Sequence, residues 1–110
     1  MMARLATCIW VSAYLHRLAQ ENIPAYVTSR GDDTAGAVFV KCATLDGQAR
    51  VMARQYDFDA DARLWTEWTS GTEGDVDAAI TSERGRDPDL WVIELESREG
   101  RTLLEDPSLA

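Results

Sequence analysis

Two runs of strand-forming residues joined by a short turn constrain the fold of this 110-residue chain more than any other feature. Residues 36–44 are rich in valine and phenylalanine, residues 49–57 alternate apolar and polar side chains, and Asp46-Gly47 lies between them. This dipeptide between two such runs is a strong signal for a two-residue hairpin turn. The pattern therefore predicts an antiparallel pair of strands, and the turn sets which residues lie opposite one another.

A two-residue turn predicts one register for the hairpin, and with it the composition of both faces. The face predicted to lie on the core gathers small and apolar side chains: Val38, Val40, Cys42, Val51 and Ala53. The opposite face gathers cations and aromatic rings around Ala43 and Met52: Phe39, Lys41, Arg50, Arg54 and Tyr56. Such a cluster can receive a phosphate, a carboxylate ligand, a stacked base or an acidic partner segment.

A second interpretation of this basic face stays open. Residues 90–98 predict another strand with Glu94 and Glu96 on one side. If that strand lies beside the hairpin, the two glutamates can pair with Arg50 and Arg54 as an exposed cross-strand ladder. Ladders of mixed charge are common on exposed sheets, and this interpretation is favoured.

The remaining elements follow from periodicity and from helix-ending residues. Apolar residues at helical spacing predict a helix over residues 7–22, and Pro24 directs the chain into a strand over residues 25–30. Residues 63–69 predict a further strand, and Asp75 is the predicted N-cap of a second helix that stops near Gly85.

These elements predict an α+β fold with the order α-β-β-β-β-α-β. We expect a mainly antiparallel sheet of about five strands with two helices on one face. The length predicts a single α+β domain over residues 1–104, followed by a flexible C-terminal tail over residues 105–110.

Charge and cysteine usage restrict the class of protein. The net charge of -8 argues against binding to nucleic acid or to an anionic membrane, and no stretch approaches the ~20 apolar residues of a membrane span. Cys8 and Cys42 are not in a metal-binding spacing and are interpreted as reduced core residues. A cytoplasmic protein is therefore expected, with a homodimer as its assembly.

Candidate catalytic groups are few. Arg30, Asp32 and Asp33 share one loop, which permits a small metal-dependent or anion-binding enzyme, although Gly and Asp are also ordinary turn residues. The alternating carboxylates of residues 57–61 begin like a calcium loop, but Ala62 replaces the required glycine. Phosphate-binding glycine loops and nucleophile motifs are absent from the sequence.

The sequence thus favours a non-enzymatic binding or protein-interaction module, with the loop enzyme as the alternative. We predict no catalytic residue, no metal ligand and no cofactor. The partner is predicted to be a protein or a small anionic ligand. The predicted binding residues are Phe39, Lys41, Arg50, Arg54, Arg30, Asp32 and Asp33.

Several segments together resemble a known family. They are the opening residues 3–7 and 9–15, the loop Arg30-Gly31-Asp32 with residues 35–38, Leu45-Asp46-Gly47, and residues 87–92. In combination they resemble a bacterial family of uncharacterised proteins, the domain-of-unknown-function family numbered 1491. The resemblance implies a bacterial, cytoplasmic, stand-alone domain and carries no activity or catalytic residue with it.

Overall fold

The computed structural model of the chain describes residues 5–109, so that Ala3, Arg4 and the last residue of the predicted tail, Ala110, lie outside the described residues. The predicted α+β class and the order α-β-β-β-β-α-β are confirmed. The elements are α1 (Thr7–Gln20), β1 (Ala25–Ser29), β2 (Val38–Ala43), β3 (Gln48–Asp57), β4 (Ala62–Thr72), α2 (Glu73–Arg86), β5 (Trp91–Glu96) and a short 3-10 helix (Pro107–Leu109).

The five strands form one mixed sheet in the order β1-β5-β2-β3-β4. Its neighbouring strands are antiparallel except for β2 and β5, which run parallel. This exception arises because the chain crosses the sheet through α2 and then inserts β5 between β1 and β2.

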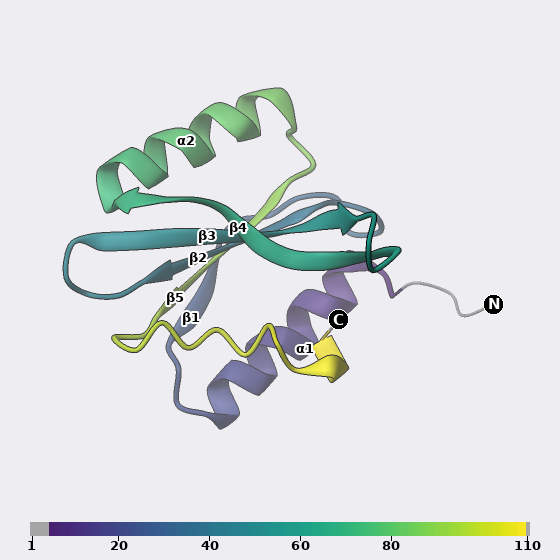
Figure 1. Cartoon of the computed structure of the whole chain (residues 1–110), viewed down its shortest axis with the longest axis horizontal. Coiled ribbons are helices and arrows are strands. Elements are labelled where there is room, and N and C mark those ends of the chain that lie inside the picture. Colours follow the sequence, from purple (N-terminus) through teal and green to yellow (C-terminus); the bar gives the residue numbers. More distant parts are fainter. Residues whose placement is uncertain (1–4, 110) are drawn as a thin grey trace.

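The two helices lie on opposite faces of the sheet, which corrects the prediction that they share one face (Figure 1). On the α1 face, α1 packs against Val40 of β2 and Ile93 of β5. On the α2 face, α2 packs against Phe39 and Val92 of the same two strands. The central strands therefore bury consecutive residues, as strands covered on both faces do.

The register of the β2–β3 hairpin is shifted by one residue from the predicted one. Val40 lies opposite Met52, and Lys41 lies opposite Val51. Because side chains alternate across a strand, a shift of one residue moves every side chain of one strand to the other face relative to its partner.

The turn of this hairpin explains the shift. The N–H of Thr44 donates to the carbonyl oxygen of Gln48 at 3.2 Å, so the loop contains three residues rather than two. The Asp46 carboxylate accepts hydrogen bonds from the Thr44 hydroxyl at 2.6 Å and from the Gln48 N–H at 3.1 Å. These bonds stabilise the longer loop, in which Leu45 and Gly47 both have positive φ.

Helix α2 begins earlier than predicted. Its N-cap is Thr72, whose hydroxyl accepts a hydrogen bond from the N–H of Asp75 at 3.2 Å, and β4 runs directly into the helix. Asp75 is therefore a residue of the first turn rather than the cap.

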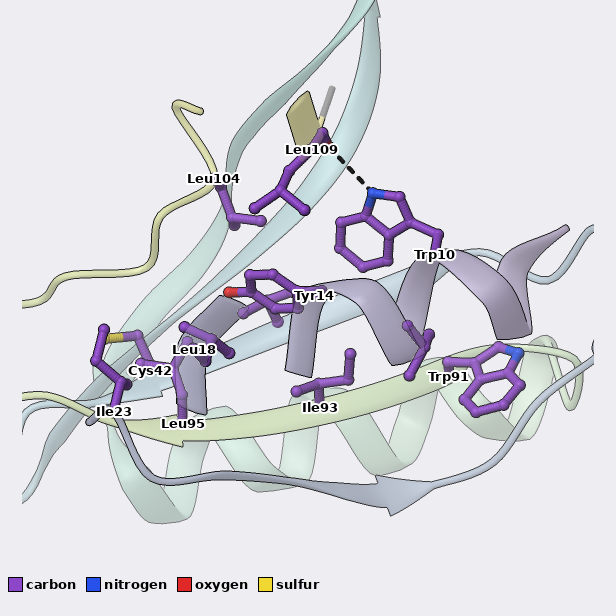
Figure 2. Close-up of a cluster of buried hydrophobic side chains, with 12 residues drawn as sticks. Trp10, Tyr14, Leu18, Ile23, Cys42, Trp91, Ile93, Leu95, Leu104 and Leu109 are labelled. Carbon is purple, nitrogen blue, oxygen red and sulfur yellow. Dashed lines mark hydrogen bonds between the residues drawn. The ribbon is translucent and has the colours of Figure 1, made fainter. Parts of the chain in front are cut away.

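The C-terminal segment, residues 100–109, packs against α1. It includes residues 105–109 of the predicted flexible tail, which are therefore packed rather than free. Leu104 and Leu109 are buried, and the indole N–H of Trp10 donates to the carbonyl oxygen of Leu109 at 3.1 Å (Figure 2). The Tyr14 hydroxyl donates to the carbonyl oxygen of Thr102 at 2.8 Å. The two leucines have apolar partners on α1 and complete the core on this face.

Candidate functional site

The predicted basic face does not exist as one surface. The observed register places Phe39 and Lys41 on the α2 face, whereas Arg50 and Arg54 lie on the α1 face. Phe39 is a core residue whose ring lies 4.5 Å from that of Trp68. The four residues therefore lie in different environments and do not form one binding surface.

Lys41 is buried and surrounded by carboxylates on the α2 face. Its ammonium lies 3.0 Å from Glu73, 2.8 Å from Asp77 and 3.1 Å from Glu94. The Tyr26 hydroxyl donates to the other oxygen of Glu94 at 2.8 Å. Burial opposes the charge of Lys41, but the hydrogen bonds to Asp77, Glu73 and Glu94 outweigh it and raise the pKa of Lys41 above its usual 10.5. Glu94 thus pairs with Lys41 and not with the arginines.

Arg50 and Arg54 hold the C-terminal segment on the α1 face. The Arg54 guanidinium lies 4.9 Å from the ring centres of both Trp10 and Trp65, and it donates to the carbonyl oxygen of Leu109 at 3.5 Å. Arg50 donates to the carbonyl oxygen of Gly100 at 2.9 Å. Both arginines therefore contribute to the packing of this segment.

A hollow of about 330 Å³ lies beside this segment. Its lining is mainly apolar and includes three charged residues, Arg63, Glu105 and Asp106. The other lining residues are Met52, Leu64, Trp65, Leu104 and Pro107. One of the charged residues, Asp106, is already paired with Arg17 of α1 at 2.6 Å.

The Arg17–Asp106 pair makes the attachment of the C-terminal segment sensitive to acid. Hydrogen bonds from the backbone N–H of Ser108 and from Arg17 lower the pKa of Asp106 from 3.8 to about 2. A lowered pKa stabilises the fold above pH 3.8, and this stabilisation is lost as the pH falls toward 2. We expect Asp106→Asn to reduce the free energy of unfolding at neutral pH, and the difference from the wild type to vanish near pH 2 in urea titrations. A difference that is independent of pH would contradict this assignment.

The Arg30–Asp33 loop connects the N-terminus of α1 to the turn before β5. The carbonyl oxygens of Asp33 and Thr34 accept hydrogen bonds from the N–H groups of Cys8 at 2.9 Å and Thr7 at 3.1 Å. They replace a side-chain cap, because the N-cap residue of α1 is Ala6 and makes no side-chain cap bond.

The charged side chains of this loop also have local partners. Arg30 pairs with Asp33 at 2.9 Å and lies 4.9 Å from the ring of Trp91. The Asp32 carboxylate accepts from the N–H groups of Thr34 and Ala35 at 3.2 Å and 2.8 Å. These contacts are those of a structural turn.

Residues 5–109 contain neither a metal-binding cluster nor a membrane-spanning helix. Within this range no three His, Cys, Asp or Glu side chains are grouped so that they could hold a metal ion. Asp57 accepts hydrogen bonds from the N–H groups of Asp59 and Ala60, and Asp61 accepts one from Tyr56, so these carboxylates shape the β3–β4 turn. Within the same range no helix is both long and apolar enough to cross a bilayer.

The feature that sequence analysis missed is the open edge of strand β1. This strand is the outermost of the sheet beside β5, and none of its five residues is charged. Tyr26 is 46% exposed and Val27 is 37% exposed, and Thr28 is also exposed. An uncharged stretch of β-forming residues after Pro24 was a sequence signal, but its position at the edge depends on the strand order.

The backbone of β1 presents unpaired groups at this edge. The N–H of Glu96 donates to the carbonyl oxygen of Pro24 at 3.0 Å, and Tyr26 lies opposite Glu94. The hydrogen-bonding groups of successive residues alternate in direction along an antiparallel strand. The backbone N–H and C=O of Tyr26 therefore point toward β5, whereas those of Ala25 and Val27 point away from it. Within residues 5–109 no hydrogen bond to these outward groups is found.

The opposite edge of the sheet is protected. Strand β4 carries Arg63 and Glu67, whereas β1 carries no charge. The pairing of each edge strand with its neighbour has one irregularity, at Val51 and Met52 of β3 for β4 and between Val27 and Ser29 for β1, so the charges make the difference. Charges on an edge strand hinder the addition of another strand. The two edges of the sheet thus differ, and β1 is the open one.

Comparison with known proteins identifies the family of this α+β chain. The sequence profile described as "Protein of unknown function (DUF1491)" matches residues 5–105. The chain therefore belongs to the DUF1491 family, which confirms the resemblance noted in its sequence. A search among curated proteins finds no match.

Solved structures of similar proteins share this fold. A crystal structure of a DUF1491 family protein from Caulobacter crescentus is 37% identical with a TM-score of 0.81, and the match covers 94% of this chain and 95% of that one. An NMR structure of a DUF1491 family protein from the same organism gives 37% identity and a TM-score of 0.82, over 96% and 97% of the two chains. The solution structure of protein Atu0922 from A. tumefaciens is 32% identical with a TM-score of 0.71, over 86% and 87%.

Proposed function

We propose that this protein is a non-enzymatic protein-interaction module that receives an extended segment of a partner at the open edge of β1. The observation that carries the proposal is the combination of outward backbone groups at Ala25 and Val27 with the exposed, uncharged side chains of Tyr26, Val27 and Thr28. An added strand would pair these groups and cover these side chains.

The environment of the predicted site residues supports a binding module rather than the loop enzyme. Lys41, Arg50, Arg30 and Asp32 take part in ion pairs or hydrogen bonds that organise the fold. The edge of β1, in contrast, has outward backbone groups at Ala25 and Val27 that no other residue within 5–109 pairs and that an added strand can pair. Natural proteins either protect an open edge or use it to bind another chain, because an unprotected edge promotes association.

The cellular setting of the module is part of the proposal. We infer that it acts in the cytoplasm of a bacterium. Two observations support this: Cys8 and Cys42 are free thiols, as is usual in a reducing compartment, and the solved relatives come from the bacteria C. crescentus and A. tumefaciens.

Site-specific photo-crosslinking in cells tests the proposal. We expect benzoylphenylalanine in place of Tyr26 to give discrete crosslinked products, whereas the same residue in place of Tyr56 gives none. Tyr56 is the matched control because it is 51% exposed and aromatic but lies on β3. A charge at the edge, in Val27→Lys, should suppress the products, because it places an ammonium where the added strand would pack.

A second control separates edge blocking from general effects of a new charge. Leu64→Lys introduces the same charge on the β4 edge at a residue that is 40% exposed, close to the 37% of Val27. It should leave the products unchanged. Equal crosslinking at positions 26 and 56, or no crosslinking at either, would refute the edge as the docking element.

A further inference from the structure

We infer that the partner at the β1 edge is a second copy of this chain, paired antiparallel through β1 about a two-fold axis at Tyr26. This inference rests on the proposed function, because it names the occupant of the same edge. The pairing would join two five-stranded sheets into one continuous sheet across the dimer.

The register of this pairing follows from the direction of the backbone groups. The outward residues are Ala25 and Val27, while Tyr26 faces β5. When Ala25 lies opposite Val27 of the partner copy, both outward residues of each strand form hydrogen-bonded pairs. A register centred on Val27 or on Ala25 would pair only one outward residue of each strand. The pairing about Tyr26 therefore satisfies the most backbone groups.

The side chains are compatible with this register. Tyr26 lies opposite its own copy in a non-hydrogen-bonded pair, where cross-strand side chains are closest, and Ala25 lies opposite Val27. Thr28 lies opposite Pro24, whose carbonyl oxygen accepts from Glu96 of β5, so that this is also a non-hydrogen-bonded pair. No charge lies opposite another over residues 23–29, since this stretch of the chain is uncharged.

The absence of charge on β1 allows a second copy to approach this edge. Each chain has a net charge of -8, so two copies repel one another over most of their surfaces. The uncharged β1 edge is a place where two acidic copies can approach without opposing charges. Because salt screens the remaining repulsion, we expect added salt to strengthen this dimer, whereas it would weaken the binding of a basic segment.

The size of the contact sets the affinity to expect. Two paired five-residue strands bury less than the roughly 1,200 Å² at the lower end of stable interfaces. We therefore expect a reversible dimer with a dissociation constant in the micromolar range. Sedimentation equilibrium of the full chain from micromolar concentrations up to about 1 mM covers this range.

The first test measures this equilibrium in the wild type, in two variants of the β1 edge and in one control variant of the β4 edge. We expect Val27→Lys to weaken the dimer at least about tenfold and Leu64→Lys to leave it unchanged. Val27→Pro should act like Val27→Lys, because it removes an outward N–H that β5 does not use. Thermal unfolding of each variant verifies that the fold is retained. A wild type that stays monomeric throughout the concentration range, or a dimer that Val27→Lys and Val27→Pro leave intact, would overturn the inference.

The second test examines the register. In a Cys8→Ala background, where the remaining Cys42 is fully buried, Tyr26→Cys should form an intermolecular disulfide under mild oxidation. The non-hydrogen-bonded Cα···Cα distance of about 4.5 Å is within disulfide range. Thr28→Cys should not form it, because Thr28 lies opposite Pro24. Disulfide formation that is as efficient at position 28 as at position 26 would contradict the two-fold axis at Tyr26.

The two proposals can fail separately. A chain that is monomeric in solution but gives crosslinks from position 26 to a different protein in cells overturns the second-copy inference and supports the proposed function. The absence of specific crosslinks at position 26 together with a monomeric chain overturns both. A crosslinked product of twice the chain mass supports both.

Discussion

Replacing Lys41 by methionine is expected to destabilise the protein by about 2–4 kcal/mol, because it removes the cation from a buried cluster of carboxylates. Lys41 is 3% exposed, and its partner Glu94 is 18% exposed. Glu73 and Asp77 are 40% and 58% exposed and can turn toward water, so Glu94 bears most of the penalty of an unpaired charge. Urea denaturation at neutral pH measures the change in the free energy of unfolding.

A double variant separates the loss of the ion pair from the loss of packing. Lys41→Met combined with Glu94→Gln should regain part of the stability, because the neutral amide no longer needs a cation. Arg63→Met is the matched control, since it removes the same charge from an exposed position on β4. It should change stability by less than about 0.5 kcal/mol. A Lys41→Met variant as stable as Arg63→Met would show that the cluster does not stabilise the fold.

The ion pairs of Lys41 also predict how the stability of the protein depends on pH. The raised pKa of Lys41 means that its contribution is fully present below pH 10.5 and is lost only as the pH rises above that value. The difference in stability between the wild type and Lys41→Met should therefore be constant from neutral pH to about 10.

Replacing Gly31 by alanine is expected to destabilise the protein by about 2–4 kcal/mol, because the added methyl group has no room. A Cβ atom at this position would lie 2.1 Å from the carbonyl oxygen of Asp89 and 2.7 Å from the Trp91 ring. The loop would have to move away from the turn before β5. This would break the hydrogen bonds from the N–H of Asp32 to Asp89 at 3.0 Å and from the Trp91 indole to Asp32 at 2.7 Å.

Gly74 provides the matched control for this variant. It lies in the first turn of α2, and no atom lies within 4 Å of an added Cβ. Gly74→Ala should leave stability unchanged or raise it by up to about 1 kcal/mol, because alanine favours helix more than glycine does. Thermal and urea unfolding of both variants checks the contrast. Similar stabilities for the two variants would show that the loop adapts to a side chain at position 31.

Local patterns in the sequence predicted the elements but not how they meet. The apolar spacing of Val11 and Leu18 located α1, and the helix-disfavouring effect of Pro24 located the start of β1. The faces were harder to assign, because Phe39 and Val92 read as outward residues until α2 is known to cover them. Which face a helix covers depends on the strand order, and no local pattern contains it.

The predicted basic face was wrong because one turn, between β2 and β3, is one residue longer than predicted. The dipeptide Asp46-Gly47 favours a two-residue loop, but the Asp46 side chain bonds to Thr44 and Gln48 and stabilises a three-residue one. That difference separates Lys41 from Arg50 and Arg54. The partners of Lys41 lie as far away in the sequence as Glu94, so its burial could not be predicted from its neighbours.

The insertion of β5 between β1 and β2 has a consequence for folding during synthesis. Strand β1 is made early, but its only neighbour in the described sheet is the last strand of the chain. Until the ribosome has released residues 91–96, β1 has no partner and exposes both of its edges. Nascent or truncated chains that lack β5 should therefore associate through this uncharged strand, and the arrival of β5 removes one of the two edges at which they can do so.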